Sequence, residues 1–240
     1  MNSHVVPLRA SLLALAISFL LLPVPEPARA ETQFGVSVFG GYNSYAMDDA
    51  NELVDQVNDA LAGTGYSMDE ISSGFAYGGG VRIRPSTSLM IALDYERLNA
   101  SSELSIFDFD FELEVPADAF TGTLIYLFPS TSRARFGIGA GLGYYSSSGS
   151  LSADSSGVGI ETDVEGSGIG FHGLGALDLA VSPVVHLEGM AGYRFAQTSD
   201  IEVAGDTAYN SEGEEATLDW SGFMSRVGLT FYFGAGAPSP

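Results

Sequence analysis

The last strand-like segment of the chain alternates residue types without a fault, and this pattern constrains the fold more than any other. Residues 227–233 read VGLTFYF, with Val, Leu, Phe and Phe on one face and Gly, Thr and Tyr on the other. Successive side chains of a strand point to opposite faces, so one face of this strand is entirely apolar. In a chain of formal net charge -21, such a face either covers the core of a soluble sheet or touches lipid.

Short turns and long loops alternate along the chain. Three Pro/Ser-rich segments, RPSTS at 84–88, PSTSR at 129–133 and VSPV at 181–184, are each flanked by alternating apolar residues. Short connections between strands have this composition. The segments between these turns are long, polar and acidic, and they cover residues 43–72, 100–118, 146–166 and 198–218. One end of the molecule is therefore expected to carry short turns and the other long loops.

The alternation predicts eight strands. They are expected at 32–43, 73–84, 88–100, 107–128, 134–147, 166–181, 184–198 and 217–233. An even number of strands joined up and down, with both termini beside the short turns, is typical of transmembrane β-barrels. The strand lengths agree with the roughly 9 to 11 tilted residues that cross a bilayer. We therefore predict an all-β fold, an eight-stranded antiparallel up-and-down transmembrane β-barrel over residues 31–233.

The two ends of the chain differ from the barrel segment. Residues 1–30 have an early Arg, an apolar run from Leu12 to Leu22 and a small-residue site at Ala28-Arg29-Ala30, which together predict a cleaved signal peptide. Residues 234–240 read as a flexible tail on the periplasmic side. The chain has no Cys, so disulfides do not contribute to its stability. It has no Lys and only nine Arg, which excludes a basic surface for nucleic acid.

The faces of the predicted strands are the inverse of those in a soluble barrel. Apolar side chains fall outward, and polar side chains or glycines fall on the inner face, where an eight-stranded barrel has little room. With its signal peptide, eight-strand meander, Pro/Ser turns and closing VGLTFYF, the chain resembles the small outer-membrane β-barrel proteins of Gram-negative bacteria, the OmpA/OmpX-like porin-family group. The resemblance implies a protein of the outer membrane, with periplasmic short turns and extracellular long loops.

Eight charged residues fall on the inner face, four basic and four acidic. They are Arg82, Arg84, Asp94, Glu96, Asp178, Glu188, Arg194 and Arg226. Because an unpaired buried charge costs several kcal/mol, these residues are expected to pair and to plug the lumen. A soluble lipocalin-like binder is the alternative fold, with the apolar residues lining a cavity.

Two histidines on the inner face are candidates for a catalytic or metal-binding site. His172 and His186 lie near Asp178 and Glu188 by alternation, as an acid/base or metal cluster would require, but no metal-ligand spacing or nucleophile accompanies them. Barrels of this kind that deacylate lipid A have a His-x-Ser pair on one strand, and neither histidine here has a Ser two residues on. We expect packing roles, no catalysis, no metal and no cofactor.

The long loops hold most of the acidic residues and two unusual segments. The acids either keep the surface solvated or share divalent cations with the phosphates of lipopolysaccharide. In the first loop, Leu53, Val57 and Leu61 recur at helical spacing, with Asp48 or Asp49 at the start and Gly63 after the end. This spacing predicts a short helix in the first extracellular loop, either as a lid on the barrel or at the lipid interface.

The second loop contains FDFDFELEV, which places Phe107, Phe109 and Phe111 on one face and acids on the other. Past Pro116 the apolar parity shifts to even-numbered residues, and this one-residue change of phase predicts a bulge or a break near Pro116 to Asp118. This strand is expected either to rise above the membrane and offer its edge and Phe residues to a partner, or to pack against its neighbours.

Two functions from different classes fit these patterns. The first is a non-catalytic outer-membrane barrel that acts through its acidic extracellular loops in envelope integrity, adhesion or surface interaction. The alternative is a small porin-like channel for ions or small solutes, since glycines line the inner face. A lipid A-modifying envelope enzyme is less favoured, because the His-x-Ser pairing is missing.

Overall fold

The computed structural model describes residues 32–106, 109–155, 158–203, 206–210 and 213–233. The predicted signal peptide and the tail at 234–240 lie outside these residues.

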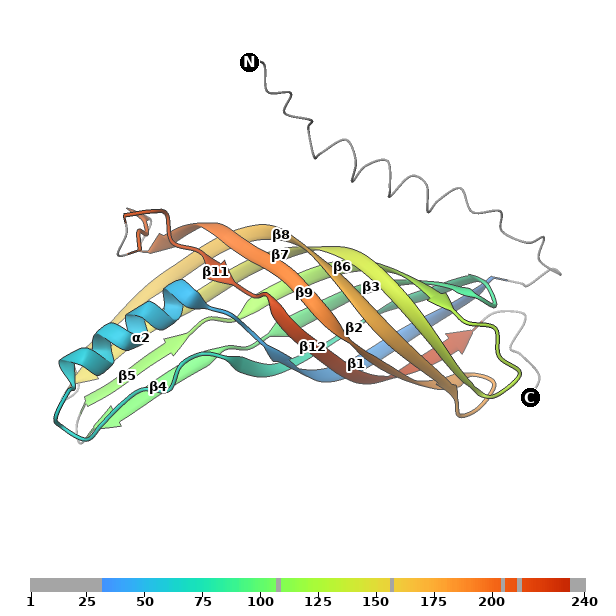
Figure 1. Ribbon diagram of the computed structural model, residues 1–240, viewed down its shortest axis with the longest axis horizontal. Coiled ribbons are helices and arrows are strands. Elements are labelled where there is room, and N and C mark those ends of the chain that lie inside the picture. The colour runs from blue at the N-terminus through green and yellow to red at the C-terminus, as the bar shows by residue number, and fades with distance from the viewer. Residues whose placement is uncertain (1–31, 107–108, 156–157, 204–205, 211–212, 234–240) are drawn as a thin grey trace, which may run out of the picture. The chain divides into compact units, whose positions relative to one another are not determined.

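Eight long antiparallel strands close into a barrel, which confirms the predicted fold (Figure 1). They are β1 (Gln33–Ser44), β2 (Ser73–Ser86), β3 (Leu89–Leu98), β6 (Ala117–Leu127), β7 (Ala134–Ser155), β8 (Val158–Ala180), β9 (Val185–Val203) and β12 (Gly222–Phe233). Each strand pairs with the next along the chain, and β12 pairs with β1 from Phe34↔Phe233 to Asn43↔Met224. A closed barrel leaves no strand edge in the membrane, where an unpaired backbone group would be costly.

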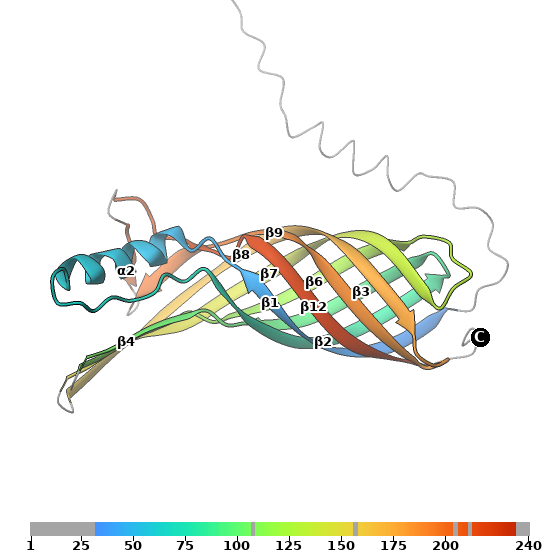
Figure 2. The same cartoon turned by 60° about the horizontal axis from the view of Figure 1, so that its bottom comes forward.

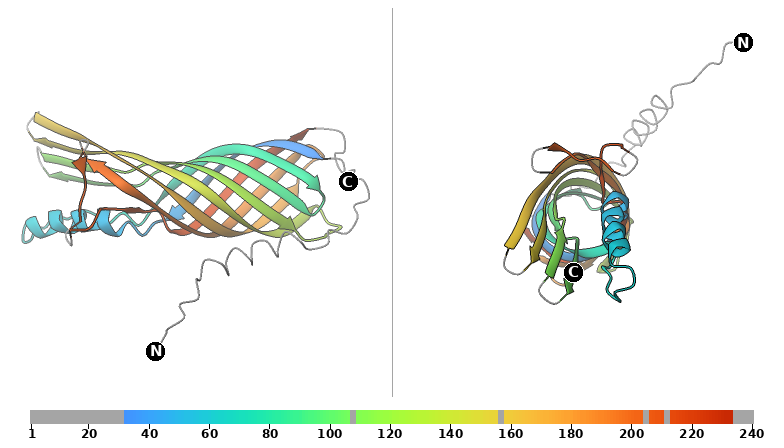
Figure 3. Two further views of the ribbon diagram at one scale, coloured as in Figure 1. Left: turned by 90° about the horizontal axis from the view of Figure 1, so that it is seen from above. Right: turned by 90° about the vertical axis from the view of Figure 1, so that its left-hand side faces the viewer.

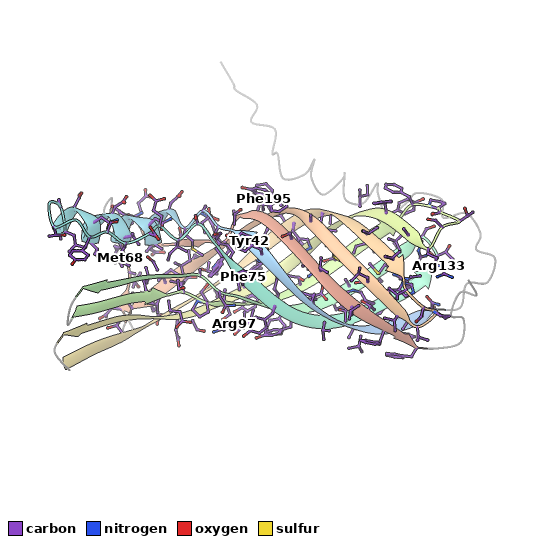
Figure 4. The ribbon with its side chains drawn as sticks, turned by 90° about the horizontal axis from the view of Figure 1, so that it is seen from below. Tyr42, Met68, Phe75, Arg97, Arg133 and Phe195 are labelled. Carbon is purple, nitrogen blue, oxygen red and sulfur yellow. The ribbon has the colours of Figure 1, made fainter. Side chains whose placement is uncertain are left out.

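The outer face of the barrel is apolar and the inner face is not. On β12, Val227, Leu229 and Phe231 are exposed, whereas Arg226 and Thr230 are buried, as the alternation predicts. Aromatic side chains mark one rim, where Tyr42, Phe75 and Phe195 lie on the outside of the barrel (Figure 4). Tyr126, Phe128 and Phe233 are exposed toward the short turns. An apolar band between two aromatic girdles is the surface that a bilayer covers.

The barrel continues beyond this band on one side (Figure 2). Strands β7 and β8 stay paired up to Ser155↔Val158, so the predicted third loop at 146–166 is mostly strand, and that prediction was wrong. The polar Ser and Gly residues that suggested a loop lie instead on strands above the lipid, where an apolar outer face is not needed. Strands β4 (Ser101–Ile106) and β5 (Phe109–Glu114) form a hairpin beside them. Two short strands, β10 (Asp206–Thr207) and β11 (Leu218–Asp219), pair with β9.

The strand breaks near Pro116, as the change of phase predicts, but it has no bulge and its register does not shift. The register of β6 on β7 includes Ala117↔Ser147, and β5 continues it at Glu114↔Ser150 without a shift. Strand pairing breaks at residues 115–116 because Pro116 has no N–H. The apolar residues change parity because the surroundings change. Lipid covers the outer face below this point, whereas above it the exposed Glu114 faces water and Leu113 packs inside.

Helix α2 (Asp48–Ala60) forms in the first long loop, as predicted (Figure 3). Ala50 and Val54 are buried in a core shared with the raised strands, and the helix runs along one side of the raised part (Figure 3). It therefore packs on protein and not at the lipid interface, and it does not lie across the barrel mouth as a lid. Met47 occupies the N-cap, and neither Asp48 nor Asp49 makes a capping bond. Both acids lie in the first turn, where negative charge is favourable.

Across the described residues, no helix has the length and apolar character needed to cross a membrane.

Candidate functional site

The middle of the lumen is filled by a buried network of ion pairs. Arg82 contacts both Asp94 and Glu188, and its Nε lies 2.8 Å from Glu188 Oε2. Asp94 also accepts from Arg226, with Nη2 2.7 Å from Oδ2. All four side chains are buried. Gly80 makes room for the network, because a Cβ there would collide with the Asp94 carboxylate.

A second cluster lies toward the short turns and is centred on Asp178. Its carboxylate pairs with Arg84 at 2.7 Å and Arg135 at 2.8 Å, and it contacts His186 Nδ1 at 2.7 Å. Arg84 also stacks over the ring of Tyr232 at 4.2 Å. Arg135 belongs to this cluster although the sequence placed it beside a turn, because its side chain lies at the barrel end and reaches inward.

The eight predicted charges do not form one network. Six of them join through Arg82, Arg84 and Arg226, whereas Glu96 and Arg194 have no ion pair among the described residues. Arg194 faces the ring of Tyr145 at 5.7 Å. Polar atoms of Asn43, Tyr45 and Arg194 are buried without a hydrogen-bond partner in the described part of the chain. In proteins, buried polar groups of this kind form hydrogen bonds with water or with a ligand.

The lumen has almost no free space at the level of the network. The void bounded by Arg82, Glu188 and Arg226 measures about 10 Å³, which barely accommodates one water molecule. A much larger depression of about 970 Å³ is lined by outward positions such as Tyr42, Tyr77 and Val227, so it belongs to the lipid-facing wall. Long side chains from other strands lie close to several inner glycines, such as Asp94 beside Gly80 and His172 beside Gly141.

An apolar core fills the inside of the raised part, on the side of the long loops, and we call it the outer cap. It combines α2, the raised strands and the loop before β12. Trp220 is fully buried at its centre, packs edge-on against Tyr45 with ring centres 5.0 Å apart, and donates from Nε1 to Ser147 Oγ at 3.0 Å. The sequence analysis did not identify this core because its buried residues come from three of the predicted loops and from barrel strands that are far apart in the sequence.

The two inner histidines do not meet. His172 Nε2 lies 2.9 Å from Thr123 Oγ1, whereas His186 binds Asp178. Within the described ranges, no group of three or more His, Asp or Glu side chains has the arrangement of a metal site.

Asp49 ties the helix to the fourth loop. Its Oδ2 accepts from the Thr217 backbone N–H at 2.8 Å and from the Thr217 hydroxyl at 3.0 Å, and its Oδ1 accepts from Asn210 Nδ2 at 3.3 Å. Partial burial alone raises the pKa of Asp49, but these hydrogen bonds outweigh it and lower the pKa below its ordinary value.

Acidification should therefore release this contact. A lowered pKa in the folded state means that Asp49 stabilises the fold above about pH 4 and that this contribution disappears as the pH falls through the folded pKa. We expect the amide of Thr217 to lose protection from hydrogen exchange in that acidic range. Asp49→Asn should show the weaker protection already at neutral pH and little further change. Equal pH profiles for the two proteins would contradict the assignment.

Two of the three predicted interaction residues lie on the raised hairpin. Phe107 is outside the described residues, whereas Phe109 and Phe111 belong to β5, opposite Ile106 and Leu104 of β4. Strand β5 is bonded on both sides, to β4 and β7, so it offers no free edge. Of the two expectations for the FDFDFELEV strand, packing against its neighbours is therefore the one observed for the described residues, and the sheet order ends at β4 instead.

The surface of the raised part is acidic. Exposed carboxylates include Asp48, Asp55, Asp59, Asp69, Glu70, Asp200, Glu202 and Asp206. Arg97 lies at the base of the raised part and is paired with Asp118 at 2.9 Å.

Comparison with known proteins shows the fold. A major outer membrane protein from Thermus thermophilus is 11% identical, with a TM-score of 0.58, and the match covers 85% of this chain and all of the other. The outer membrane protein OprG from Pseudomonas aeruginosa is 11% identical, with a TM-score of 0.50, over 86% and 97% of the two chains. The Neisserial surface protein A is 19% identical, with a TM-score of 0.48, over 83% and 97%.

No protein-family model and no curated protein matches the sequence. The fold is that of the small outer-membrane β-barrels.

Proposed function

We propose that this protein is a closed, non-catalytic barrel of the outer membrane that acts through its raised extracellular part, in adhesion, surface interaction or envelope integrity. The observation that carries the proposal is the double closure of the lumen. Ion pairs around Arg82 fill its middle, and the outer cap around Trp220 fills the inside of the raised part. A barrel blocked in both places works at its surface.

The raised part has the size and chemistry of an interaction surface. Strands β7, β8 and β9 continue into it, the β4–β5 hairpin joins β3 to β6 there, and α2 completes it. Its acidic residues face water, and we propose that they share divalent cations with lipopolysaccharide phosphates or attract a basic protein partner. Phe107, Phe109 and Phe111 remain candidates for that contact.

Removal of the hairpin tests the proposal. The register is unbroken, so residues 101–114 can be replaced by Asn-Gly, which joins the paired residues Ala100 and Val115. We expect this variant to keep the heat-dependent gel shift of a folded barrel and to lose attachment of expressing cells to protein-coated surfaces. A control replaces Thr87 and Ser88, the two-residue turn between β2 and β3 at the other end of the barrel, with Asn-Gly. If cells with the shortened protein attach as well as cells with the full chain, the raised hairpin is not the working surface.

A further inference from the structure

The free edge of β4 has a defined set of unpaired backbone groups. The Val115 N–H donates to Ala100 C=O at 2.8 Å, so even-numbered residues of this strand direct their backbone groups to β5. Odd-numbered residues direct theirs to the other side, where the Asn99 N–H reaches Phe75 C=O at 3.1 Å. The backbone N–H and C=O groups of residues 101, 103 and 105 point to this same side, farther along the raised hairpin.

Strand β2 does not follow them. It begins at Ser73, and the chain before it is held by α2, since the Asn51 side chain donates to Ile71 C=O and accepts from Ile71 N–H. The sheet order accordingly ends at β4 on this side. The other end of the sheet is the two-residue strand β10, so β4 is the longer of the two edges. An edge strand is a template for another extended chain.

The surroundings of this edge are acidic. Asp69 and Glu70 are exposed in the loop that Ser102 holds by a hydrogen bond to Asp69 C=O, and Glu114 is exposed on β5. Arg97, which lies below the edge, is already paired with Asp118. A second copy of this chain, with its net charge of -21, would bring like charges together at this edge.

We propose that the β4 edge binds a cationic extended peptide segment as an added strand. Backbone bonds to residues 101, 103 and 105 provide the attachment, and basic side chains of the added strand face the carboxylates beside it. This inference rests on the proposed function, because it names the chemistry of the partner at the same raised hairpin.

A labelled synthetic peptide of about eight alternating Lys and Val residues tests the proposal by fluorescence anisotropy with the refolded full chain in neutral detergent. Its companion peptide has the same sequence with every backbone amide N-methylated, which removes the N–H donors of both strand edges and keeps the charge. We expect the N-methylated peptide to bind about tenfold more weakly, as the loss of one to two hydrogen bonds implies.

A substitution in strand β4 provides a second test of the same proposal. Ser105→Pro removes an N–H that points away from β5, a position where an edge strand tolerates proline, and should weaken binding of the unmodified peptide about tenfold. Ser105→Ala is the matched control and should leave binding unchanged. If both peptides bind equally well, or if Ser105→Pro binds as the unchanged protein does, attraction is purely electrostatic and the proposal is wrong. An open channel would overturn the proposed function without changing these binding results.

Discussion

Asp94→Ala should lower the stability of the barrel by about 3–5 kcal/mol. Asp94 is buried, and both Arg82 and Arg226 pair with it. Without its carboxylate, Arg82 keeps only Glu188, and Arg226 keeps the sulfur of Met190 and the ring of Phe39, neither of which carries a charge. The cost comes from leaving a guanidinium buried and uncompensated. Urea unfolding of the protein refolded in lipid vesicles measures it.

An exposed ion pair offers a matched control. Asp118 also pairs with an arginine, but the side chains of Arg97 and Asp118 are 26% and 32% exposed. Asp118→Ala should cost less than about 1 kcal/mol, because water solvates the arginine that remains. If the two substitutions have similar effects, the lumen is hydrated enough to screen its charges, and the network does not act as a plug.

Trp220→Ala should destabilise the outer cap by about 3–5 kcal/mol, the usual cost of removing a large buried aromatic side chain. Trp220 is fully buried, and its loss also removes the contact with Tyr45 and the hydrogen bond to Ser147. We expect hydrogen exchange to accelerate in α2 and in the loop before β12, while the lipid-embedded strands stay protected.

The exposed Tyr209 serves as the comparison for this substitution, because its side chain is 63% exposed on the same side of the molecule. Tyr209→Ala should leave exchange in α2 unchanged. If Trp220→Ala also leaves α2 protected, the helix is held by other contacts, and the cap is not one cooperative core.

The membrane part of this fold was predictable because lipid imposes a strict alternation. The apolar outer face of β12, the short Pro/Ser turns and the inner charges all follow from a period of two residues in a two-sided environment. The raised part was less predictable because its environment changes partway along the strands. The change of apolar parity at Pro116 suggested an irregular strand, whereas the register on β7 is continuous. The parity changes because the surroundings of the outer face change from lipid to water.

The candidate site was predicted in the same uneven way. Alternation identified the eight inner charges by face, but it does not give their height along the lumen, which depends on strand tilt and stagger. Glu96 and Arg194 therefore share a face with the network without joining it, and Arg135 joins it from the barrel end. The contact of Asp49 with Thr217 joins residues 168 positions apart, which no local pattern reveals.

Ion conductance across a planar bilayer tests the central claim most directly. The protein would be refolded, checked by its heat-dependent gel shift, and inserted at increasing concentration, with a known porin in the same bilayer as the positive control. We predict no stable current steps, because ion pairs around Arg82 fill the lumen and the outer cap fills the inside of the raised part. Discrete, reproducible steps from the folded protein would show an open lumen and contradict the account of a closed barrel that acts through its raised surface.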